Sequence, residues 1–247
     1  MRALRILLIV VVILGGLFVG ADRLAVNFAE DEVASKLQST ENLAQTPDVS
    51  INGFPFLTQL VGGSLDDVEI GIDGYEAVTG DDGQKIRIDD LDAQMKGVEF
   101  SGDYSSATAR TATGTALISY PELLKTAQSS EDTEVAPGVT AKVVGLSDGG
   151  NGKIKVAVEA TVLGNKLPAP VSVLSTVTVV DGDNVRVKAD ALPEIGGVQI
   201  AEDQIRAITD FEQSIRDLPG GIQLDKVEAA KDGVEISVKG SDVRLAG

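Results

Sequence analysis

The chain has 247 residues, enough for one large domain or two small ones, and 43% of them are hydrophobic, so a disordered chain is not expected. It contains neither His nor Cys, which excludes Ser-His-Asp and Cys-His catalysis, imidazole and thiolate metal sites, and disulfides. A net charge of −17 opposes binding to nucleic acid and simple adsorption onto an anionic membrane surface.

The N-terminal segment has the composition of an export signal. Arg2 and Arg5 precede an apolar run over residues 6–21, and a basic region followed by such a run directs a chain across a membrane. Small residues before Asp22 fit a cleavage site, whereas the run, with Leu4 included, is nearly long enough to span a bilayer. Residues 1–21 are therefore interpreted as a signal peptide or a membrane anchor. In both cases the remainder lies on the extracytoplasmic side, either anchored to the plasma membrane or secreted.

A helix is expected next, over residues 22–37, because Leu24, Phe28, Val33 and Leu37 recur at helical spacing. Beyond the breaker at residues 46–48 the chain changes to period-two alternation, which predicts β-strands. The alternating segments lie at residues 65–72, 86–95, 154–162, 171–179, 185–189, 222–227 and 234–238. Residues 129–138 are interpreted as a loop.

Two more helices are expected among the strands. A short one begins near Ser119, which is a candidate N-cap followed closely by Pro121. A longer amphipathic one covers residues 202–218 and ends before Pro219. Since no segment resembles a long linker, residues 22–247 are expected to form a single domain.

These elements predict an α+β fold, dominated by a long antiparallel sheet with one apolar face and few helices to cover it. The sheet can close as a barrel or sandwich, wrap a long helix, or enclose a ligand. The pattern of residues leaves these three arrangements open.

The segment over residues 49–63 contains two of the six Phe, with a Pro between them. Gly53 permits a tight bend, and Pro55 fixes an extended or turn conformation. The apolar side chains around them either plug the core at a corner of the sheet or belong to a binding site.

This segment also carries a resemblance to a known family. The strings I-x-G-F-P-F-L-T-Q-L at residues 51–60, I-S-Y-x-x-L at 118–123 and L-P-G-G-I-x-L-x-x-V at 218–227 resemble the LmeA-like phospholipid-binding family of actinobacterial envelope proteins. The signal segment and the closing D-G-V-x-I-x-V-x-G at residues 232–240 extend the likeness over nearly the whole chain. The resemblance implies a tubular lipid-binding (TULIP-like) fold, in which a strongly curved sheet wraps a helix and leaves an apolar groove. It also implies a role in binding phospholipid and supporting cell-envelope lipids or lipoglycans.

The expected partner is therefore a phospholipid or a related membrane lipid whose acyl chains lie in an apolar groove. The membrane itself is a further partner if residues 1–21 are retained. The candidate groove residues are Leu24, Phe28, Phe54, Phe56, Leu57, Leu60, Ile205, Ile208 and Phe211. No catalytic residue, metal or cofactor is expected, and the chain is not expected to be an enzyme.

Two other functions stay open. A carboxylate-dependent envelope hydrolase would use a pair among Asp89, Asp90 and Asp92, although alternating Asp residues are more typical of a solvated sheet face. A structural scaffold that partners a membrane glycosyltransferase, or another envelope-synthesis enzyme, would instead have a solid core and a stable protein partner.

Overall fold

The computed structural model describes residues 2–79, 84–103, 105–128, 133–190, 206, 210–214 and 221–246. The helices in these ranges are α1 (Arg2–Thr40), α2 (Phe56–Val61) and α3 (Tyr120–Gln128). The strands are β1 (Asp48–Asn52), β2 (Ser64–Thr79), β3 (Gln84–Phe100), β4 (Ala107–Ser119), β5 (Thr133–Ala136), β6 (Val139–Gly150), β7 (Lys153–Val162), β8 (Asn165–Lys166), β9 (Val171–Val180), β10 (Asn184–Ala189), β11 (Phe211–Ser214), β12 (Ile222–Ala229) and β13 (Gly233–Ala246).

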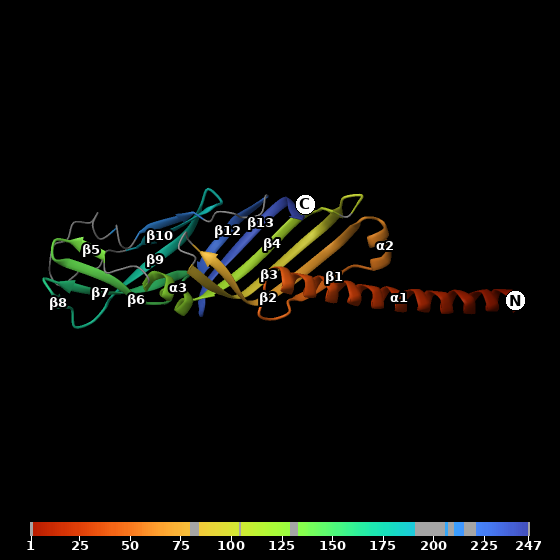
Figure 1. Ribbon diagram of the computed structural model, residues 1–247, viewed down its shortest axis with the longest axis horizontal. Helices are drawn as coiled ribbons and strands as arrows, with labels where there is room; N and C mark the ends of the chain where they lie inside the picture. The colour runs from red at the N-terminus through yellow and green to blue at the C-terminus, as the bar shows by residue number, and fades with distance from the viewer. Residues whose placement is uncertain are drawn as a thin grey trace.

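The strands form two antiparallel sheets that lie one after the other along the molecule (Figure 1). The first sheet has the order β1-β2-β3-β4-β13-β12, and the second has the order β11-β10-β9-β7-β6-β5, with β8 paired to β7. The expected α+β class, with long antiparallel strands and few helices, is confirmed. The strands are divided between two sheets, where the sequence pattern suggested one.

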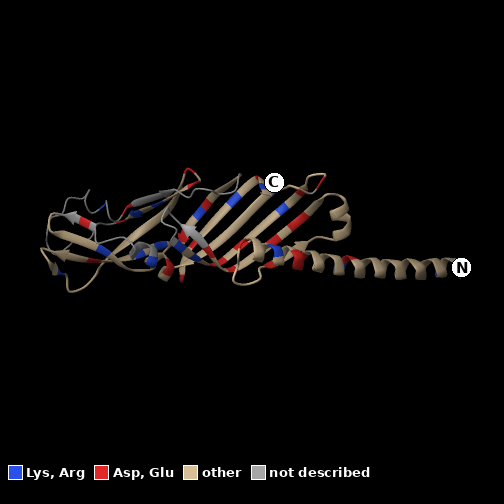
Figure 2. Cartoon of the chain, viewed as in Figure 1, with Lys and Arg blue, Asp and Glu red and all other residues tan. Residues whose placement is uncertain are grey.

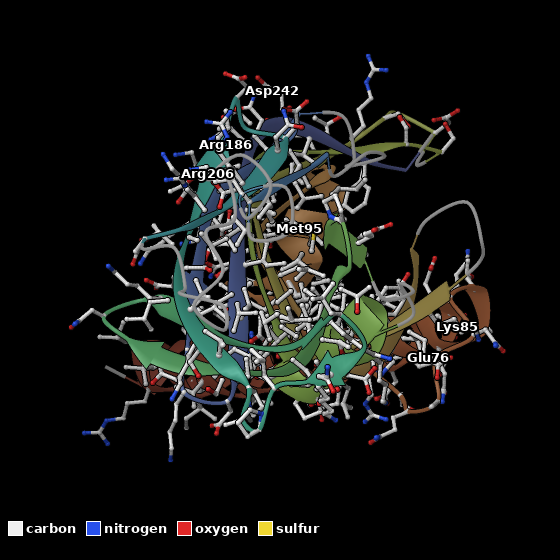
Figure 3. All side chains as sticks on the ribbon, turned by 90° about the vertical axis from the view of Figure 1, so that its left-hand side faces the viewer. Glu76, Lys85, Met95, Arg186, Arg206 and Asp242 are labelled. Atoms are coloured by element: carbon white, nitrogen blue, oxygen red, sulfur yellow. The ribbon has the colours of Figure 1, made fainter. Side chains whose placement is uncertain are left out.

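The two sheets join at β12. The backbone N–H of Leu224 donates to the carbonyl of Gly182, in the turn between β9 and β10, at 2.7 Å. A shared cluster of buried residues lies across the junction, and it contains Tyr120, Ile154, Val177, Val187, Val227 and Val234. Viewed along the long axis, carbon-rich side chains lie on the inner side of the curved strands, and the buried Met95 is one of them (Figure 3).

Two glycines keep the apolar face of the long β2–β3 hairpin continuous. The buried or half-buried apolar residues of β3 are Ile86 and Ile88, then Leu91, Ala93 and Met95, and then Val98 and Phe100. The alternation therefore slips by one residue twice, although the pairing with β2 keeps one register. The slips coincide with Gly74 (φ 67°), which lies opposite Asp89, and with Gly97 (φ 61°). Only glycine adopts such a φ readily, so it can redirect the side chains that follow.

Helix α1 is much longer than the helix expected over residues 22–37, because it also includes the whole apolar run. Its first half is exposed, and the helix is long and apolar enough to cross a membrane. Its second half is attached to the first sheet through one stripe of residues. Asp22, Val26 and Ala34 are buried on that stripe, and Glu30 accepts a hydrogen bond from the N–H of Ile51 at 2.8 Å.

This stripe differs from the one that helical spacing predicted. Leu24 and Phe28 were expected to face the domain and Glu30 to face solvent, whereas Leu24 and Phe28 are exposed and Glu30 binds the edge strand. The reason is a set of hydrogen bonds. Carboxylates of α1 satisfy backbone N–H groups of α2 and β1 that have no partner within their own element, and this outweighs burial of two apolar side chains.

Two further expectations need correction, and some elements were not predicted. The predicted helix over residues 202–218 does not persist, because Phe211–Ser214 is strand β11 and pairs with β10. Arg206 is helical, but Ile205 and Ile208 lie outside the described residues. The predicted loop over residues 129–138 contains strand β5, and the long strands β4 and β6 and the short helix α2 were not predicted.

We predict that Asp22→Ala destabilises the fold at neutral pH. The Asp22 carboxylate is fully buried and accepts the N–H of Leu57 at 2.8 Å. Burial opposes its ionisation, but the N–H groups of Leu57 and Phe56 and the neighbouring Arg23 together lower the pKa of Asp22. The thermal midpoint of the full chain in detergent should therefore fall at pH 7.

A pH series separates this effect from a simple packing defect. The penalty of Asp22→Ala should shrink as the pH falls from about 4 through the lowered pKa, because the wild-type carboxyl then becomes protonated as well. Asp31→Ala, an exposed carboxylate on the same helix, is the control and should leave the midpoint unchanged. A penalty for Asp22→Ala that stays constant down to pH 2 would contradict the proposed interaction.

We also predict that Gly97→Ala lowers the free energy of unfolding by about 1–2 kcal/mol, because an L-residue is strained at this φ. A Cβ there would also lie 3.2 Å from the Cβ of Arg110. Gly102→Ala is the matched control, since no heavy atom of the described chain lies within 4 Å of its Cβ position. Equal effects of the two substitutions on urea denaturation would refute the role given to Gly97.

Candidate functional site

The apolar face of the first sheet contains two rows of residues that run across its strands. The first row runs Ile72, Leu91, Ala116, Ile236 and Val227, and the second runs Ile70, Ala93, Gly114, Val238 and Leu224. All of them except Val227 and Leu224 are only half-buried. Together, the eight half-buried residues are called the floor below. None of them carries a charge.

Strand β4 gives this face a strip of small side chains. Its apolar positions are Ala107, Ala109, Ala112, Gly114 and Ala116, and the first bulky residue is Ile118. Larger side chains flank the strip, such as Met95 on β3 and Val238 on β13. Small residues also lie beside parts of the strip, since Ala93 on β3 is opposite Gly114 and Gly240 on β13 is opposite Ala112.

The floor is covered at one end by α1 and α2. Val26 of α1 and Phe56 of α2 are buried against Met95, Val98, Ala109 and Val243 of the sheet. Ile70, at the edge of the floor, packs against this cluster. Ala109 and Ala112 of the small-residue strip are buried here, whereas Gly114 and Ala116 are not.

The other end is covered by α3 and the second sheet. The hydroxyl of Tyr120 donates to the carbonyl of Ala230 at 2.8 Å, which fixes α3 against the turn between β12 and β13. Burial, together with the charges of Asp148 and Asp232, raises the pKa of Tyr120, so its hydroxyl stays a donor at neutral pH. Leu123 of α3 and Ile236 of the floor both pack against the buried cluster at this junction.

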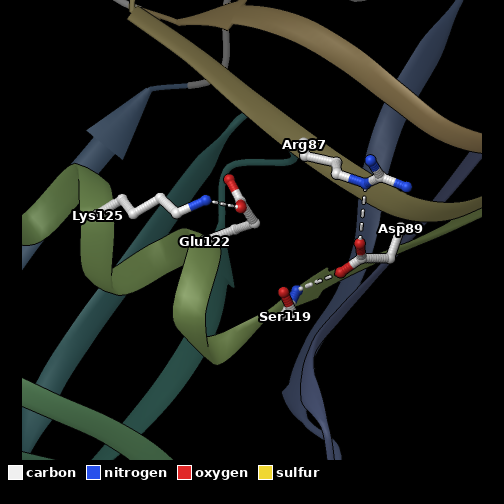
Figure 4. A network of polar contacts seen from close by, with 5 residues as sticks. All are labelled: Arg87, Asp89, Ser119, Glu122 and Lys125. Carbon is white, nitrogen blue, oxygen red and sulfur yellow. Dashed lines mark hydrogen bonds and ion pairs between the residues drawn. The ribbon is translucent and has the colours of Figure 1, made fainter. Parts of the chain in front are cut away.

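A small polar network holds the start of α3 (Figure 4). The carboxylate of Asp89 accepts the N–H of Ser119 at 3.2 Å and pairs with Nε of Arg87 at 3.3 Å. Lys125 forms an ion pair with Glu122 on the exposed side of the helix. Asp89 therefore has a structural role at the junction between β4 and α3.

The strands of the first sheet also carry charged residues of both signs (Figure 2), and the alternation places Asp90, Asp92 and Gln94 on the face opposite Leu91, Ala93 and Met95. This opposite face contains a cleft of about 490 Å³ lined by five carboxylates (Asp48, Glu69, Asp73, Asp90 and Asp92), by Ser, Thr and Gln residues, and by Gly71 together with Ile70, Ala93 and Gly114 of the floor strands. This cleft and the floor lie on opposite faces of the same strands. Within the described ranges, no group of three or more Asp, Glu, His or Cys residues is placed to hold a metal ion.

Asp90 is the carboxyl of this cleft whose pKa is shifted from its ordinary value. Partial burial raises its pKa, and the charges of Asp92 and Asp73 raise it further. A carboxyl with a raised pKa beside ionised ones is one requirement of acid–base hydrolysis, but Asp90 is exposed and the cleft is open to water. Asp89 points to the α3 junction and does not share this cleft.

Six of the nine residues proposed for the groove have described side chains, and these six lie at the end of the floor where α1 and α2 meet the sheet. Phe56 is buried in the cluster below α2, and Leu57 packs against that cluster. Leu24, Phe28, Phe54 and Leu60 are exposed at the same end of the molecule. Phe211 lies on β11, and Ile205 and Ile208 are outside the described residues.

Part of the floor could be predicted from the sequence. The alternating apolar residues of β2, β3 and β13 were recognised, but β4 was not, because Ala, Thr and Gly give a weak strand signal. The regular recurrence of Ala and Gly at every second or third position over residues 107–116 was the signal that could have identified it.

Comparison with known proteins gives one match. A family model described as LmeA-like phospholipid-binding matches residues 20–239. A search of curated proteins and a search of solved structures each returned no match.

We predict that Asp90→Asn raises the free energy of unfolding at pH 7 by less than about 1 kcal/mol, because it removes like-charge repulsion at an exposed site. Folding disfavours the ionised form of Asp90, so the gain should vanish below about pH 4, where the carboxyl is protonated in both states. Asp89→Asn should bring no gain, since Asp89 has Arg87 and the N–H of Ser119 as partners. Denaturant unfolding at pH 7 and pH 3 measures the free energy of unfolding of both variants. A loss of stability in Asp90→Asn at pH 7 would contradict the predicted like-charge repulsion.

Proposed function

Since this chain belongs to the LmeA-like phospholipid-binding family, we propose that it holds phospholipid acyl chains against the half-buried floor of the first sheet. The observation that carries the proposal is the floor itself. It is a continuous, uncharged surface, and among the described residues α1, α2, α3 and the second sheet cover its two ends. The part of this apolar surface that is still accessible to solvent is unfavourable in water, and a bound acyl chain would remove it from water.

The strip along β4 has suitable dimensions. The part of the strip between the buried Ala112 and Ile118, residues 113–117, extends about 16 Å at the usual rise of a strand. One leaflet of a bilayer contributes about 15 Å of hydrocarbon, so an acyl chain of ordinary length fits along the strip. Each CH₂ group buried there would contribute about 0.8 kcal/mol to binding.

The floor offers no charged group to select a head group. We infer that the head group stays near water and that the protein accepts phospholipids, or related envelope lipids, of several head-group types. Binding of this kind needs no catalytic residue, and we propose that the chain is a binding protein that supports envelope lipids or lipoglycans.

We further propose that the chain is exported and that α1 is retained as an anchor. The helix continues without a break from the apolar run through Ala21 into the part that packs on the sheet. Asp22, the residue after the candidate cleavage site, is buried at the start of α2. An intact α1 therefore suits a domain that is held at the outer face of the plasma membrane.

The proposal predicts that protein purified from cells carries phospholipid. Native mass spectrometry of the full chain in detergent should show bound lipid, and Ala116→Phe should weaken binding. A phenyl ring that displaces about two CH₂ groups from the floor removes about 1.6 kcal/mol, or roughly ten-fold in affinity.

Thr115→Phe is the matched control, because it adds the same ring to the adjacent residue on the polar face of β4. Thr115→Phe should retain the wild-type lipid content. Asp90→Asn should retain it as well, although a hydrolase acting through the acidic cleft would need the Asp90 carboxylate. Lipid-free wild-type protein, or equal losses in Ala116→Phe and Thr115→Phe, would refute binding on the floor.

A further inference from the structure

We propose that α2 and the loop before it rest on the membrane as an apolar foot, beside the point where α1 leaves the bilayer. The foot consists of Phe54, Leu60 and Val61, together with Leu24 and Phe28 of α1. This inference rests on the proposal that α1 spans the membrane, and it adds a second contact between the domain and the lipid surface. The partner is the bilayer itself.

One hydrogen bond fixes the position of α2 along the axis of α1. Asp22 is the first residue after the apolar run, so it marks the level at which α1 reaches the membrane surface. Its carboxylate accepts the N–H of Leu57, in the first turn of α2, at 2.8 Å. Helix α2 therefore lies at the level of the interface, at the end of the domain from which α1 extends (Figure 1).

The side chains at this level are apolar and exposed. The exposed fraction is 86% for Val61, 57% for Phe54, 73% for Leu24 and 72% for Phe28. Residues 53–63 contain no Asp, Glu, Lys or Arg, although 24% of the whole chain is charged. An uncharged segment with outward apolar side chains is typical of a surface that meets lipid or another apolar surface.

The orientation of α1 brings its own apolar residues to the same surface. Because Asp22, Val26 and Ala34 face the domain, Leu24 and Phe28 are turned outward. The guanidinium of Arg23 lies 5.1 Å from the centre of the Phe54 ring, which links the helix to the loop. An aromatic ring with a cation above it suits the head-group region, where apolar and charged groups meet.

A foot at this position would connect the bilayer to the small-residue strip. Ala107 and Ala109 of β4 pack in the same cluster as Phe56 of α2. The uncovered part of the strip, at Gly114 and Ala116, begins beyond this buried cluster, so an acyl chain that leaves the outer leaflet at the foot would pass α2 before it reaches the strip. A second copy of the chain is the competing occupant, but α1 places this end of the domain against lipid.

The chain contains no Trp, so single Trp substitutions report on depth without a background signal. The test uses the full chain in liposomes of phosphatidylcholine and phosphatidylglycerol, with and without brominated acyl chains. Val61→Trp and the conservative Phe54→Trp report on the foot, and Leu14→Trp reports on the span. Leu163→Trp is the control, because Leu163 is 77% exposed but lies in the turn between β7 and β8 at the far end of the molecule.

We expect blue-shifted emission and bromine quenching for Val61→Trp and Phe54→Trp, stronger quenching for Leu14→Trp, and neither effect for Leu163→Trp. Quenching of Leu14→Trp without quenching of the two foot reporters would overturn the foot while leaving the anchor in place. Loss of quenching in all of them would overturn both. A blue shift at Val61→Trp without bromine quenching would show that protein covers the foot, and would also refute the proposal.

Discussion

The described helices and the second sheet bury the two ends of the apolar face of the first sheet and leave its middle half-buried, and the arrangement of the described elements depends on this face. Alternation along β2, β3, β4 and β13 makes one face apolar over the whole length of the strands. Helices α1 and α2 bury one end, and α3 with the second sheet buries the other. Between these clusters, Leu91, Ala116 and Ile236 are half-buried. An incompletely covered apolar surface of this kind is typical of a site that binds an apolar partner.

Carboxylates determine how the helices meet this sheet. Asp22 and Glu30 bind backbone N–H groups of α2 and β1, and Asp89 binds the N–H of Ser119 where α3 begins. These hydrogen bonds satisfy groups that would otherwise lack partners at the ends or edges of elements. They also explain why the more apolar side of α1, with Leu24 and Phe28, faces away from the domain. Some of the acidic residues therefore have a structural role, and others line the cleft on the polar face of the first sheet.

The sequence allowed the fold class, the antiparallel strands, α3 and the family to be predicted, because these depend on alternation, on Pro and Gly signals and on the string at residues 51–60. The position of the floor was not predicted, since Ala and Gly on β4 give little hydrophobic signal although they create the strip. The orientation of α1 was predicted wrongly because helical spacing counts apolar residues and ignores carboxylates that bind another element. Strand β11 was predicted as helix because Phe211 continued an apolar stripe, whereas pairing with β10 overrides that local preference.

Photocrosslinking with a phosphatidylcholine that carries a diazirine near the end of one acyl chain tests the central claim most directly. After illumination and proteolysis, the labelled peptides identify the surface that the acyl chain contacts. Lipid held on the floor should give adducts on residues 107–118 of β4 and 233–240 of β13, in addition to those on the apolar half of α1. Adducts confined to α1, with the two strands unlabelled, would show that the exposed apolar face of the first sheet does not bind lipid.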